Sequence, residues 1–381
     1  MDLAFCLYSY FPFGGLQRNL FEIARLCVQR GHTVHAFARR WEGSPPDWME
    51  IDLLPVRAIS NVGRDEAFAR RLKPFIDADR FDVVIGFNRL PGLDLFYAAD
   101  PCLAWQYRER RPHHRLTRRY RLRRNWEHRI FSPAAKTEIL LVAAREKERF
   151  QTAYGTPDCR FHVLPPNLDR DTLLTNKNSE ELQAVRSEFG IPPGDRVVLT
   201  VGSGFRTKGV DRSIRAFSAL PPELRKQSRL LVVGRDRNSA RYEHIAGQLG
   251  AGDRVHFTGG RQDVPAFYHA ADLLIHPART ENTGTVLLEA MAMGLPVLTS
   301  QVCGYAGFVT EADAGTVLPE TMTQKDLDDA LLAALQNDTG RRYWSANGRR
   351  FAESTDLYSR YHKAADVIDD WLARNRAWAH S

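Results

Sequence analysis

Short apolar segments alternate with longer stretches of helical periodicity along most of this 381-residue chain. The first half contains apolar segments at 3–8, 33–38, 83–86 and 139–143, and helical stretches such as 16–30, which ends at Gly31, lie between them. The second half repeats the pattern at 197–201, 230–234, 255–258, 273–275 and 296–299. Buried strands that alternate with helices are typical of parallel sheets. We therefore predict an α/β protein with two doubly wound, Rossmann-like domains.

The boundary between the domains is predicted at the turn Pro165-Pro166-Asn167, because two prolines continue neither a helix nor a central strand. A chain of this length exceeds the size at which one core stops growing. We place the first domain at 1–166 and the second at 167–355, and we interpret the polar, aperiodic segment 172–181 as a connecting loop. The helical periodicity of 358–378 predicts a last helix, within about 356–381, that crosses back to the first domain.

The composition is that of a soluble globular protein, with 43% hydrophobic and 26% charged residues. No apolar run approaches the roughly 20 residues that cross a bilayer. The N-terminus lacks the basic region and cleavage site of a secretory signal, and the five cysteines form no C-x-x-C pair. We expect a cytoplasmic protein in which three of the cysteines, those beside apolar neighbours, are reduced core residues. The net charge of +7 favours an anionic partner.

The segment 271–291 has the features of an anion site at the start of a helix. The strand 273–275 runs into a polar loop, and the helix that follows begins near Thr283, Gly284 and Thr285. Backbone N–H groups of a first helical turn lack internal partners and bind phosphate. Glu281 and Glu289 bracket this turn, and since carboxylates repel phosphates, we expect them to face sugar hydroxyls. An ordinary amphipathic helix with a surface glutamate at each end fits the same pattern.

A second loop, within 200–211, carries Arg206 and Lys208 between a predicted strand and helix. Such cations beside a glycine-rich loop suit a diphosphate. The triplet Gly202-Ser203-Gly204 begins like a dinucleotide fingerprint, but the third glycine and the later acid are missing, so NAD binding is weakly supported. Both loops are expected at the carboxyl ends of neighbouring strands, where open α/β sheets bind ligands.

Gly14 and Gly15 follow the first strand and open the next helix. Adjacent glycines allow close approach of the backbone and positive φ angles. The pair fits a simple tight turn equally well, but its place after the first strand favours a site that lines the cleft between the domains.

These motifs, in this order and spacing, resemble those of the GT-B retaining glycosyltransferases. The segments A-F-C-L-Y-S-Y-F-P-F-G-G-L-Q-R, G-F-N-R-L-P-G-L-D, G-V-D-R-S-I, A-A-D-L-L-I-H-P-A and V-C-G-Y-A are similar to those of the bacterial lipopolysaccharide core glucosyltransferases I, a family that adds a hexose from a UDP-sugar to an inner-core heptose. The resemblance covers nearly the whole chain. It implies the GT-B fold and UDP-sugar-dependent hexosyl transfer.

The resemblance also implies roles for individual residues. Arg206 and Lys208 would stabilise the departing UDP, Glu289 would bind the ribose, and Asp100 would lie close to the reacting sugar. Glu281 and the backbone of 282–286 would bind the donor sugar and its phosphates. The implied catalytic residues are Lys208, Arg206, Asp100 and Glu281, and the implied donor-binding residues are Gly15, Arg170, Arg206, Lys208, Arg261, Gln262, Glu281, Asn282, Thr283, Gly284, Thr285, Val286 and Glu289.

Cleavage of the anomeric bond gives an oxocarbenium-like sugar and a UDP that gains negative charge, so positive groups matter more than a nucleophile. The resemblance implies front-face displacement, with a phosphate oxygen taking the acceptor proton and with no required metal. The D-x-D triplets 77–79 and 169–171 are interpreted as solvated loop acids.

The chain departs from the family pattern at three places. Asn19 stands where the family commonly has an acid, Thr207 lies beside the lysine with the arginine displaced to 206, and E-N-T-G-T carries bulkier side chains than usual. The first two departures leave the acceptor contacts open, including the role of Asn19. The third leaves the donor open between UDP-glucose, which we favour, and a UDP-N-acetylhexosamine.

The segment 105–129 contains ten arginines and three histidines against Glu109 and Glu127, with four interleaved aromatic residues. Such a segment suits an anionic membrane surface, suits nucleic acid nearly as well, and fits a solvated basic helix too. Because the implied acceptor is a lipid-linked glycan at the inner leaflet, we expect docking to the inner membrane and no nucleic-acid partner. The competing hypothesis is a membrane- or nucleic-acid-binding protein that keeps the fold but has lost transfer activity.

Overall fold

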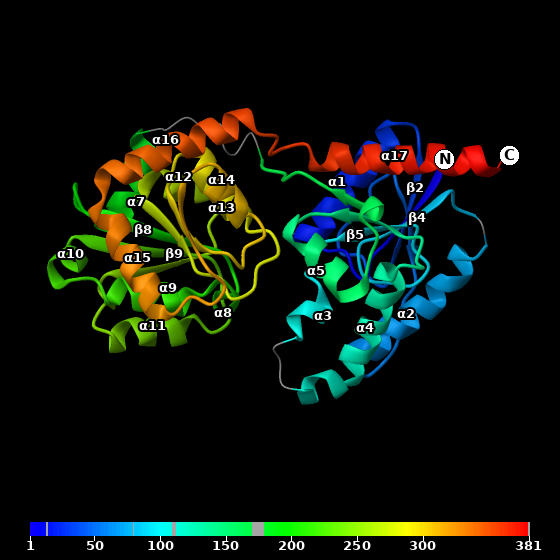
Figure 1. The fold of residues 1–381 in the computed structure, drawn as a ribbon, viewed down its shortest axis with the longest axis horizontal. Coiled ribbons are helices and arrows are strands. Elements are labelled where there is room, and N and C mark those ends of the chain that lie inside the picture. The colour runs from blue at the N-terminus through cyan, green and yellow to red at the C-terminus, as the bar shows by residue number, and fades with distance from the viewer. Residues whose placement is uncertain (13, 79, 109–111, 170–178, 380–381) are drawn as a thin grey trace. The chain divides into compact units, whose positions relative to one another are not determined.

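The computed structural model describes the 381 residues except 13, 79, 109–111, 170–178 and 380–381. The chain forms two compact units, one of Met1–Asn167 with Ser359–Ser381 and one of Leu168–Tyr358 (Figure 1). Each contains one parallel sheet. The predicted α/β class with two doubly wound domains is thereby confirmed. Arg170, which was expected to contact the donor, and residues 172–178 of the predicted connecting loop lie outside the described residues.

The first unit is built on a seven-stranded sheet with the order β3-β2-β1-β4-β5-β6-β7. Its strands are β1 Asp2–Cys6, β2 Thr33–Ala38, β3 Glu50–Leu53, β4 Val83–Gly86, β5 Leu95–Ala98, β6 Glu138–Leu141 and β7 Phe161–Val163. Every pairing is parallel. The sequence analysis missed β3, β5 and β7, which have three or four residues each. Strands β3 (E-I-D-L) and β7 (F-H-V) lie at the two edges of the sheet and mix polar with apolar residues, so neither forms a continuous apolar run.

The helices of the first unit are α1 Gly15–Gln29, α2 Asn61–Ile76, α3 Leu103–Gln106, η1 Pro112–Leu116, α4 Arg118–Phe131, α5 Arg145–Tyr154, η2 Asp158–Arg160 and the last helix α17 Arg360–Ala379. Helix α17 packs on α1. Arg30, at the end of α1, forms ion pairs of 2.7 Å with both Asp366 and Asp369, and His32 lies 2.7 Å from Asp369. These contacts attach the last helix to the first unit.

The second unit has a six-stranded parallel sheet with the order β10-β9-β8-β11-β12-β13. Its strands are β8 Arg196–Val201, β9 Ser228–Val233, β10 Val255–Gly259, β11 Leu273–His276, β12 Val297–Ser300 and β13 Gly315–Leu318. Its helices are α7 Ser179–Glu188, α8 Phe205–Lys208, α9 Val210–Ser218, α10 Pro222–Lys226, α11 Ser239–Gln248, α12 Val264–Ala270, α13 Thr285–Ala292, α14 Ala306–Glu311, α15 Gln324–Gln336 and α16 Asp338–Ser354. Helix α7 shows that the loop predicted at 172–181 was wrong for its last three residues.

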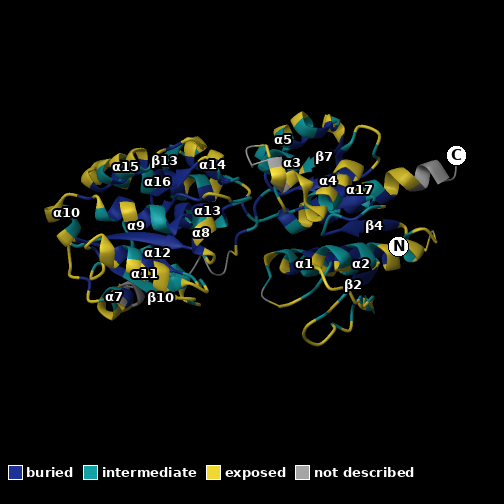
Figure 2. Cartoon of the chain, turned by 90° about the horizontal axis from the view of Figure 1, so that it is seen from below, coloured by how far each residue is buried: buried dark blue, intermediate teal, exposed yellow. Residues whose placement is uncertain are grey.

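Helices cover the faces of each sheet, so its central strands are buried while the outer sides of the helices are exposed (Figure 2). The edge strands β3, β7, β10 and β13 are only partly buried. In β8, Leu199 and Val201 belong to one apolar cluster and Val198 to another on the opposite face. In β1, Phe5 and Cys6 are divided in the same way. The five cysteines are free, and four of them are buried.

Candidate functional site

Two loops of the second unit leave neighbouring strands at the carboxyl edge of the sheet. Strand β8 pairs with β9 on one side and with β11 on the other, so the strand order reverses its direction at β8. The loop after β8 leads to α8, and the loop after β11 leads to α13. The crevice at such a switch point is where open α/β sheets bind ligands. The structure therefore brings together the two loops that the sequence predicted to be neighbours.

The two loops are tied to each other by backbone and side-chain contacts. The Arg279 amide donates to the Thr207 carbonyl at 2.8 Å, and the Arg279 guanidinium forms bonds of 2.6 and 2.8 Å with both carboxylate oxygens of Asp211. Gly209 has a φ of +74°, and a Cβ atom there would lie 2.1 Å from the Pro277 carbonyl oxygen. Only glycine fits such a contact, so the sequence K-G at 208–209 fixes how closely the loops approach.

Lys208 and Glu281 form an ion pair at the centre of this edge. The Lys208 stem passes over Gly202, where a Cβ atom would lie 3.2 Å from Lys208 Cε. Behind the carboxylate, the fully buried His276 places Nε2 3.5 Å from Glu281 Oε2. Burial acts to raise the pKa of Glu281, but His276 and the Lys208 charge outweigh it and lower that pKa to about 2. Glu281 is thus an ionised acceptor at neutral pH.

Helix α13 begins at Thr285 after Gly284, whose φ of +85° lies in the left-handed region. A Cβ atom at Gly284 would lie 3.3 Å from Cys303 Cβ. The Tyr305 amide donates to the Thr283 carbonyl at 2.8 Å, which holds the loop before the helix, including Asn282. The amides of Thr285 and Val286 lie in the first turn of α13, where backbone N–H groups have no carbonyl of the same helix to bind. This end of α13 therefore has the donors that an anion requires.

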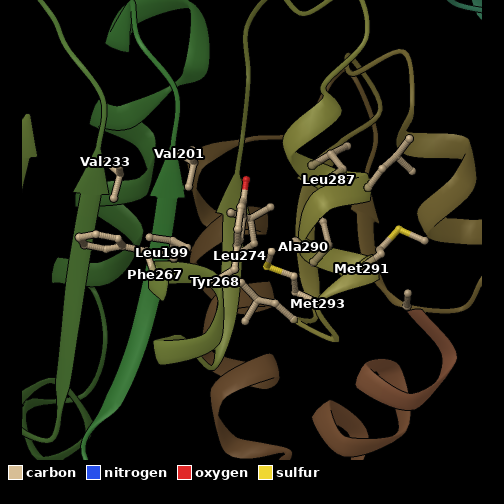
Figure 3. Close-up of a cluster of buried hydrophobic side chains, with 14 of the residues drawn as sticks. Leu199, Val201, Val233, Phe267, Tyr268, Leu274, Leu287, Ala290, Met291 and Met293 are labelled. Atoms are coloured by element: carbon tan, nitrogen blue, oxygen red, sulfur yellow. The ribbon is translucent and has the colours of Figure 1, made fainter. Parts of the chain in front are cut away.

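Glu289 lies on α13 and is held by a residue that the sequence analysis did not identify. The hydroxyl of Tyr268, on α12, donates to Glu289 Oε2 at 2.6 Å. Tyr268 is 3% exposed, and Figure 3 shows its oxygen at the level of Val201, near the carboxyl end of β8. A buried tyrosine hydroxyl usually has a partner. That rule signals a polar contact for Tyr268 but does not tell which residue provides it.

The other donor-binding residues predicted for the second unit lie at its surface. Arg206 is exposed, and its guanidinium makes no ion pair with any residue described. Arg261 is engaged by Glu188 at 2.8 Å and by Asp263 at 2.8 Å, and these carboxylates raise its pKa. Its Nε and Nη atoms donate four hydrogen bonds to these two carboxylates, which leaves one of its five N–H donors for a nucleotide contact. Gln262 is exposed beside it.

In the first unit, Gly15 is the first residue of α1 and Gly14 is its N-cap. Adjacent glycines allow positive φ angles, but neither glycine has one here. Gly14 has a φ of −87°, and Gly15 is not among the described glycines with positive φ. A Cβ atom at Gly14 would collide with Gln17 Oε1 at 1.9 Å, whereas one at Gly15 would meet no atom within 4 Å. Asn19 accepts a hydrogen bond of 3.0 Å from the Tyr361 hydroxyl of α17. That contact gives Asn19 a structural partner.

The side chain of Asp100 is 68% exposed and forms an ion pair with Arg89. Arg89 Nη1 lies 3.1 Å from Asp100 Oδ2, and Arg89 Nη2 donates to the Pro101 carbonyl at 2.8 Å. The same guanidinium contacts Glu127, which is 0% exposed, at 3.1 Å. Glu127 also accepts from the amides of Leu103 at 2.9 Å and Ala104 at 3.2 Å, so it caps α3. Glu127 is therefore an internal anchor of α4 and not part of its surface charge.

Helix α4 buries one side and exposes a basic side. Its buried residues are Trp126, Glu127, Ile130 and Phe131, while Arg118, Arg119, Arg121, His128 and Arg129 are exposed. The aromatic residues are mostly covered: Trp126 lies in the core, and Trp105 packs under the guanidinium groups of Arg108 and Arg149 at 5.1 and 5.5 Å. The exposed surface is thus more cationic and less aromatic than the sequence indicated.

The two D-x-D triplets are only partly described. Asp77 is the C-cap of α2 and pairs with Lys73, and Asp169 is the described acid of the second triplet, while Asp79 and Asp171 lie outside the described residues. Among the residues that the structure describes, no group of three or more His, Cys, Asp or Glu side chains is arranged to hold a metal ion.

Comparison with known proteins assigns the family. The model "Glycosyltransferase Family 4" matches residues 13–172, and "Glycosyl transferases group 1" matches residues 183–351. The lipopolysaccharide glucosyltransferase WaaG of Escherichia coli K12 is 41% identical over 98% of this chain and 100% of its own length. The chain belongs to this glycosyltransferase family. The resemblance found in the sequence motifs is confirmed.

Solved structures of other proteins show the same architecture. The crystal structure of WaaG, described as a glycosyltransferase involved in lipopolysaccharide biosynthesis, is 41% identical and covers 96% of this chain and 99% of its own, with a TM-score of 0.86. Anabaena Alr3699/HepE in complex with UDP and glucose is 18% identical, covers 97% and 100%, and has a TM-score of 0.71. At that identity HepE shares the fold alone. These neighbours confirm the GT-B fold.

Proposed function

We propose that this glycosyltransferase moves a hexose, with retention of configuration, from a UDP-sugar to an inner-core heptose of lipopolysaccharide. The observation that carries the proposal is the Lys208–Glu281 pair beside the start of α13, at the switch point of the second sheet. This edge of the sheet thus has, within two adjacent loops, a cation and amide donors that can bind phosphate and an ionised carboxylate that can accept from sugar hydroxyls. The relative that is 41% identical carries the name of a lipopolysaccharide glucosyltransferase.

The reaction needs charge stabilisation at the leaving diphosphate. Lys208 and Arg206 would face the oxygen that gains charge as the anomeric bond breaks, and the first-turn amides of α13 would bind the other phosphate oxygens. Glu281 would orient the sugar through its hydroxyls, while Asp100 of the first unit would lie near the reacting carbon. In a front-face displacement, a phosphate oxygen of the leaving group accepts the proton of the attacking hydroxyl, so no covalent enzyme intermediate forms. We propose that no metal takes part, and transfer is expected to continue in EDTA.

UDP-glucose is the proposed donor. The name of the E. coli relative supports glucose, and the bulkier side chains of Asn282 and Thr283 are the positions that would decide between glucose and an N-acetylhexosamine. Thermal shifts measured with UDP-glucose and with UDP-N-acetylhexosamines separately would rank the donors, because the tighter ligand stabilises the protein more.

The acceptor side of the proposal places the enzyme at the cytoplasmic face of the inner membrane. No helix within the described part of the chain is long and apolar enough to span a bilayer. Attachment would come from the exposed arginines of α4, each contributing about 1 kcal/mol at an anionic surface. Peripheral docking of this kind would bring the first unit to a lipid-linked, phosphorylated acceptor.

Release of UDP tests the proposal directly. The full chain is incubated with UDP-glucose and a lipopolysaccharide acceptor truncated after the inner-core heptoses, and UDP is quantified with and without acceptor. Acceptor-dependent UDP release is expected. If no UDP-hexose yields UDP above the acceptor-free control, the alternative of a binding protein without transfer activity replaces the proposal.

A further inference from the structure

Helix α12 carries a buried tyrosine hydroxyl that contacts Glu289, the predicted ribose-binding residue of α13. Its Tyr268 is 3% exposed, and its hydroxyl donates to Glu289 Oε2 at 2.6 Å. The ring packs in the apolar cluster that also contains Leu287 and Leu288, so the hydroxyl is the polar end of an otherwise apolar contact (Figure 3). Tyr268 thus joins α12 to α13 through this hydrogen bond, from a fixed position in the core.

The hydrogen bond restricts the direction of the Glu289 carboxylate. A glutamate side chain on a helix surface samples several rotamers, and ordering such a side chain costs up to about 2 kcal/mol. A hydrogen bond to a charged group contributes about 1.5–3 kcal/mol, which is enough to offset that cost. Burial and the Glu289 charge both raise the pKa of Tyr268 well above its ordinary value. The phenol therefore stays a donor over the whole working pH range.

We propose that Tyr268 is a positioning residue that sets Glu289 to bind the ribose hydroxyls of the donor, so that the enzyme selects ribonucleotides. The inference rests on the proposed function, since it takes Glu289 as the ribose contact. Tyr268 touches neither the nucleotide nor the sugar, and it acts through the carboxylate alone. Because the ribose is remote from the bond that breaks, the contact is equal in the ground state and the transition state, and its loss changes KM and leaves kcat unchanged.

The test compares binding of UDP and 2′,3′-dideoxy-UDP by calorimetry in the full chain and in Tyr268→Phe. The wild type is expected to bind UDP at least about tenfold more tightly than the dideoxy analogue. In Tyr268→Phe, UDP binding should weaken about tenfold, while the analogue binds within about twofold of its wild-type affinity. For transfer, the donor KM should rise about tenfold with kcat within about twofold.

Two further variants separate positioning from a structural effect. Tyr242→Phe removes another buried phenol of the same unit, one that packs edge-on against Phe205 and for which the described residues provide no hydrogen-bond acceptor. It should keep the preference for UDP. Glu289→Gln should lose that preference, and adding Tyr268→Phe to Glu289→Gln should cause no further loss, because both changes act on one contact.

The outcomes distinguish the inference from the function it rests on. If the wild type binds UDP and prefers it to the dideoxy analogue, but Tyr268→Phe keeps the same preference, the positioning role is wrong and the proposed function stands. If the wild type binds both ligands equally, the ribose contact is absent and the inference alone is overturned. If the wild type fails to bind UDP at all, both proposals are overturned. Should Tyr268→Phe fold poorly, Glu289→Gln alone must abolish the preference, and a retained preference there also overturns the inference.

Discussion

The ammonium of Lys208 contacts the carboxylate of Glu281 across the two loops that leave β8 and β11. The carboxylate has lost most of its water, and its second neighbour is the buried His276 at 3.5 Å. The pair therefore holds the lysine over the edge of the sheet before any ligand arrives. A lysine ammonium has three donors, so it can keep Glu281 as a partner and still bind a phosphate oxygen.

Replacement of Lys208 by alanine should abolish most of the transfer activity. Removal of one preorganised donor from a developing negative charge typically costs about 10²–10³ in kcat. We expect Lys208→Ala to lose at least about 100-fold in UDP release while its circular dichroism spectrum stays that of the wild type. Lys226→Ala removes an exposed lysine that pairs with Glu223 and should be fully active. Wild-type turnover in Lys208→Ala would show that the pair has no catalytic part.

The same pair predicts how stability depends on pH. Glu281 has a pKa of about 2 in the folded protein against 4.5 for an ordinary glutamate. A folded-state pKa below the unfolded value means that the unfolded chain binds the proton first, so the stabilisation is complete above about pH 4.5 and is lost as the pH falls towards 2. The difference in thermal midpoint between wild type and Glu281→Gln should therefore shrink over that window. A constant difference from pH 7 to pH 2 would contradict the ion pair.

Much of the fold was predictable because its strands are buried on both faces. Continuous apolar runs such as 197–201 and 230–234 are visible in the sequence, and the structure has β8 and β9 there. Strands β3, β5, β7 and β13 were not predicted, and three of them, β3, β7 and β13, are edge strands that form beside a neighbour already in place. Tertiary context, not local pattern, creates such strands.

The position of the phosphate-binding loops was predictable from the sequence, but the contacts between the side chains of the site were not. Glycines at 202, 204 and 284 and the loops after two strands indicated where phosphate would bind. Nothing in the sequence indicated that His276 lies behind Glu281 or that Tyr268 reaches Glu289, because both contacts join residues through packing of separate elements. Likewise, the sequence suggested that Glu127 offsets part of the positive charge of the segment 105–129, but the structure buries this side chain completely, away from the basic surface.

Gly209 should be essential to the spacing of the two loops. Its φ of +74° disfavours any Cβ, and the added atom would lie 2.1 Å from the Pro277 carbonyl oxygen, so Gly209→Ala must push the Lys208 loop from its place. We expect a loss of about 2 kcal/mol or more in unfolding free energy, together with a fall in UDP release. Gly307→Ala is the matched control, since a Cβ atom there meets nothing within 4 Å inside α14. Equal thermal midpoints for the two variants would refute this role.

Glu127 should be the most sensitive acid of the first unit. It is 0% exposed and is surrounded by Arg89, the Tyr154 hydroxyl and two amides of α3. Removal of one partner from a buried charge pair costs about 3–5 kcal/mol, so Glu127→Ala should lower the thermal midpoint by many degrees. The exposed Glu148 of α5 is the comparison, and Glu148→Ala should stay within about 0.5 kcal/mol of the wild type. A small effect at Glu127 would mean that α3 is held in some other way.

The exposed arginines of α4 should control attachment to anionic membranes. Arg119 and Arg121 are exposed, and none of the ion pairs found in the described residues involves either of them. Each surface cation contributes about 1 kcal/mol at an anionic bilayer, so reversal of both charges should weaken binding to vesicles containing phosphatidylglycerol about 30-fold or more. The Arg237→Glu/Arg241→Glu variant makes the same change of net charge in the exposed residues at α11 of the second unit and should bind like the wild type. Sedimentation with vesicles at two salt concentrations measures the effect, since salt screens a surface attraction. If both double variants lose binding equally, net charge and not α4 attaches the protein to the membrane.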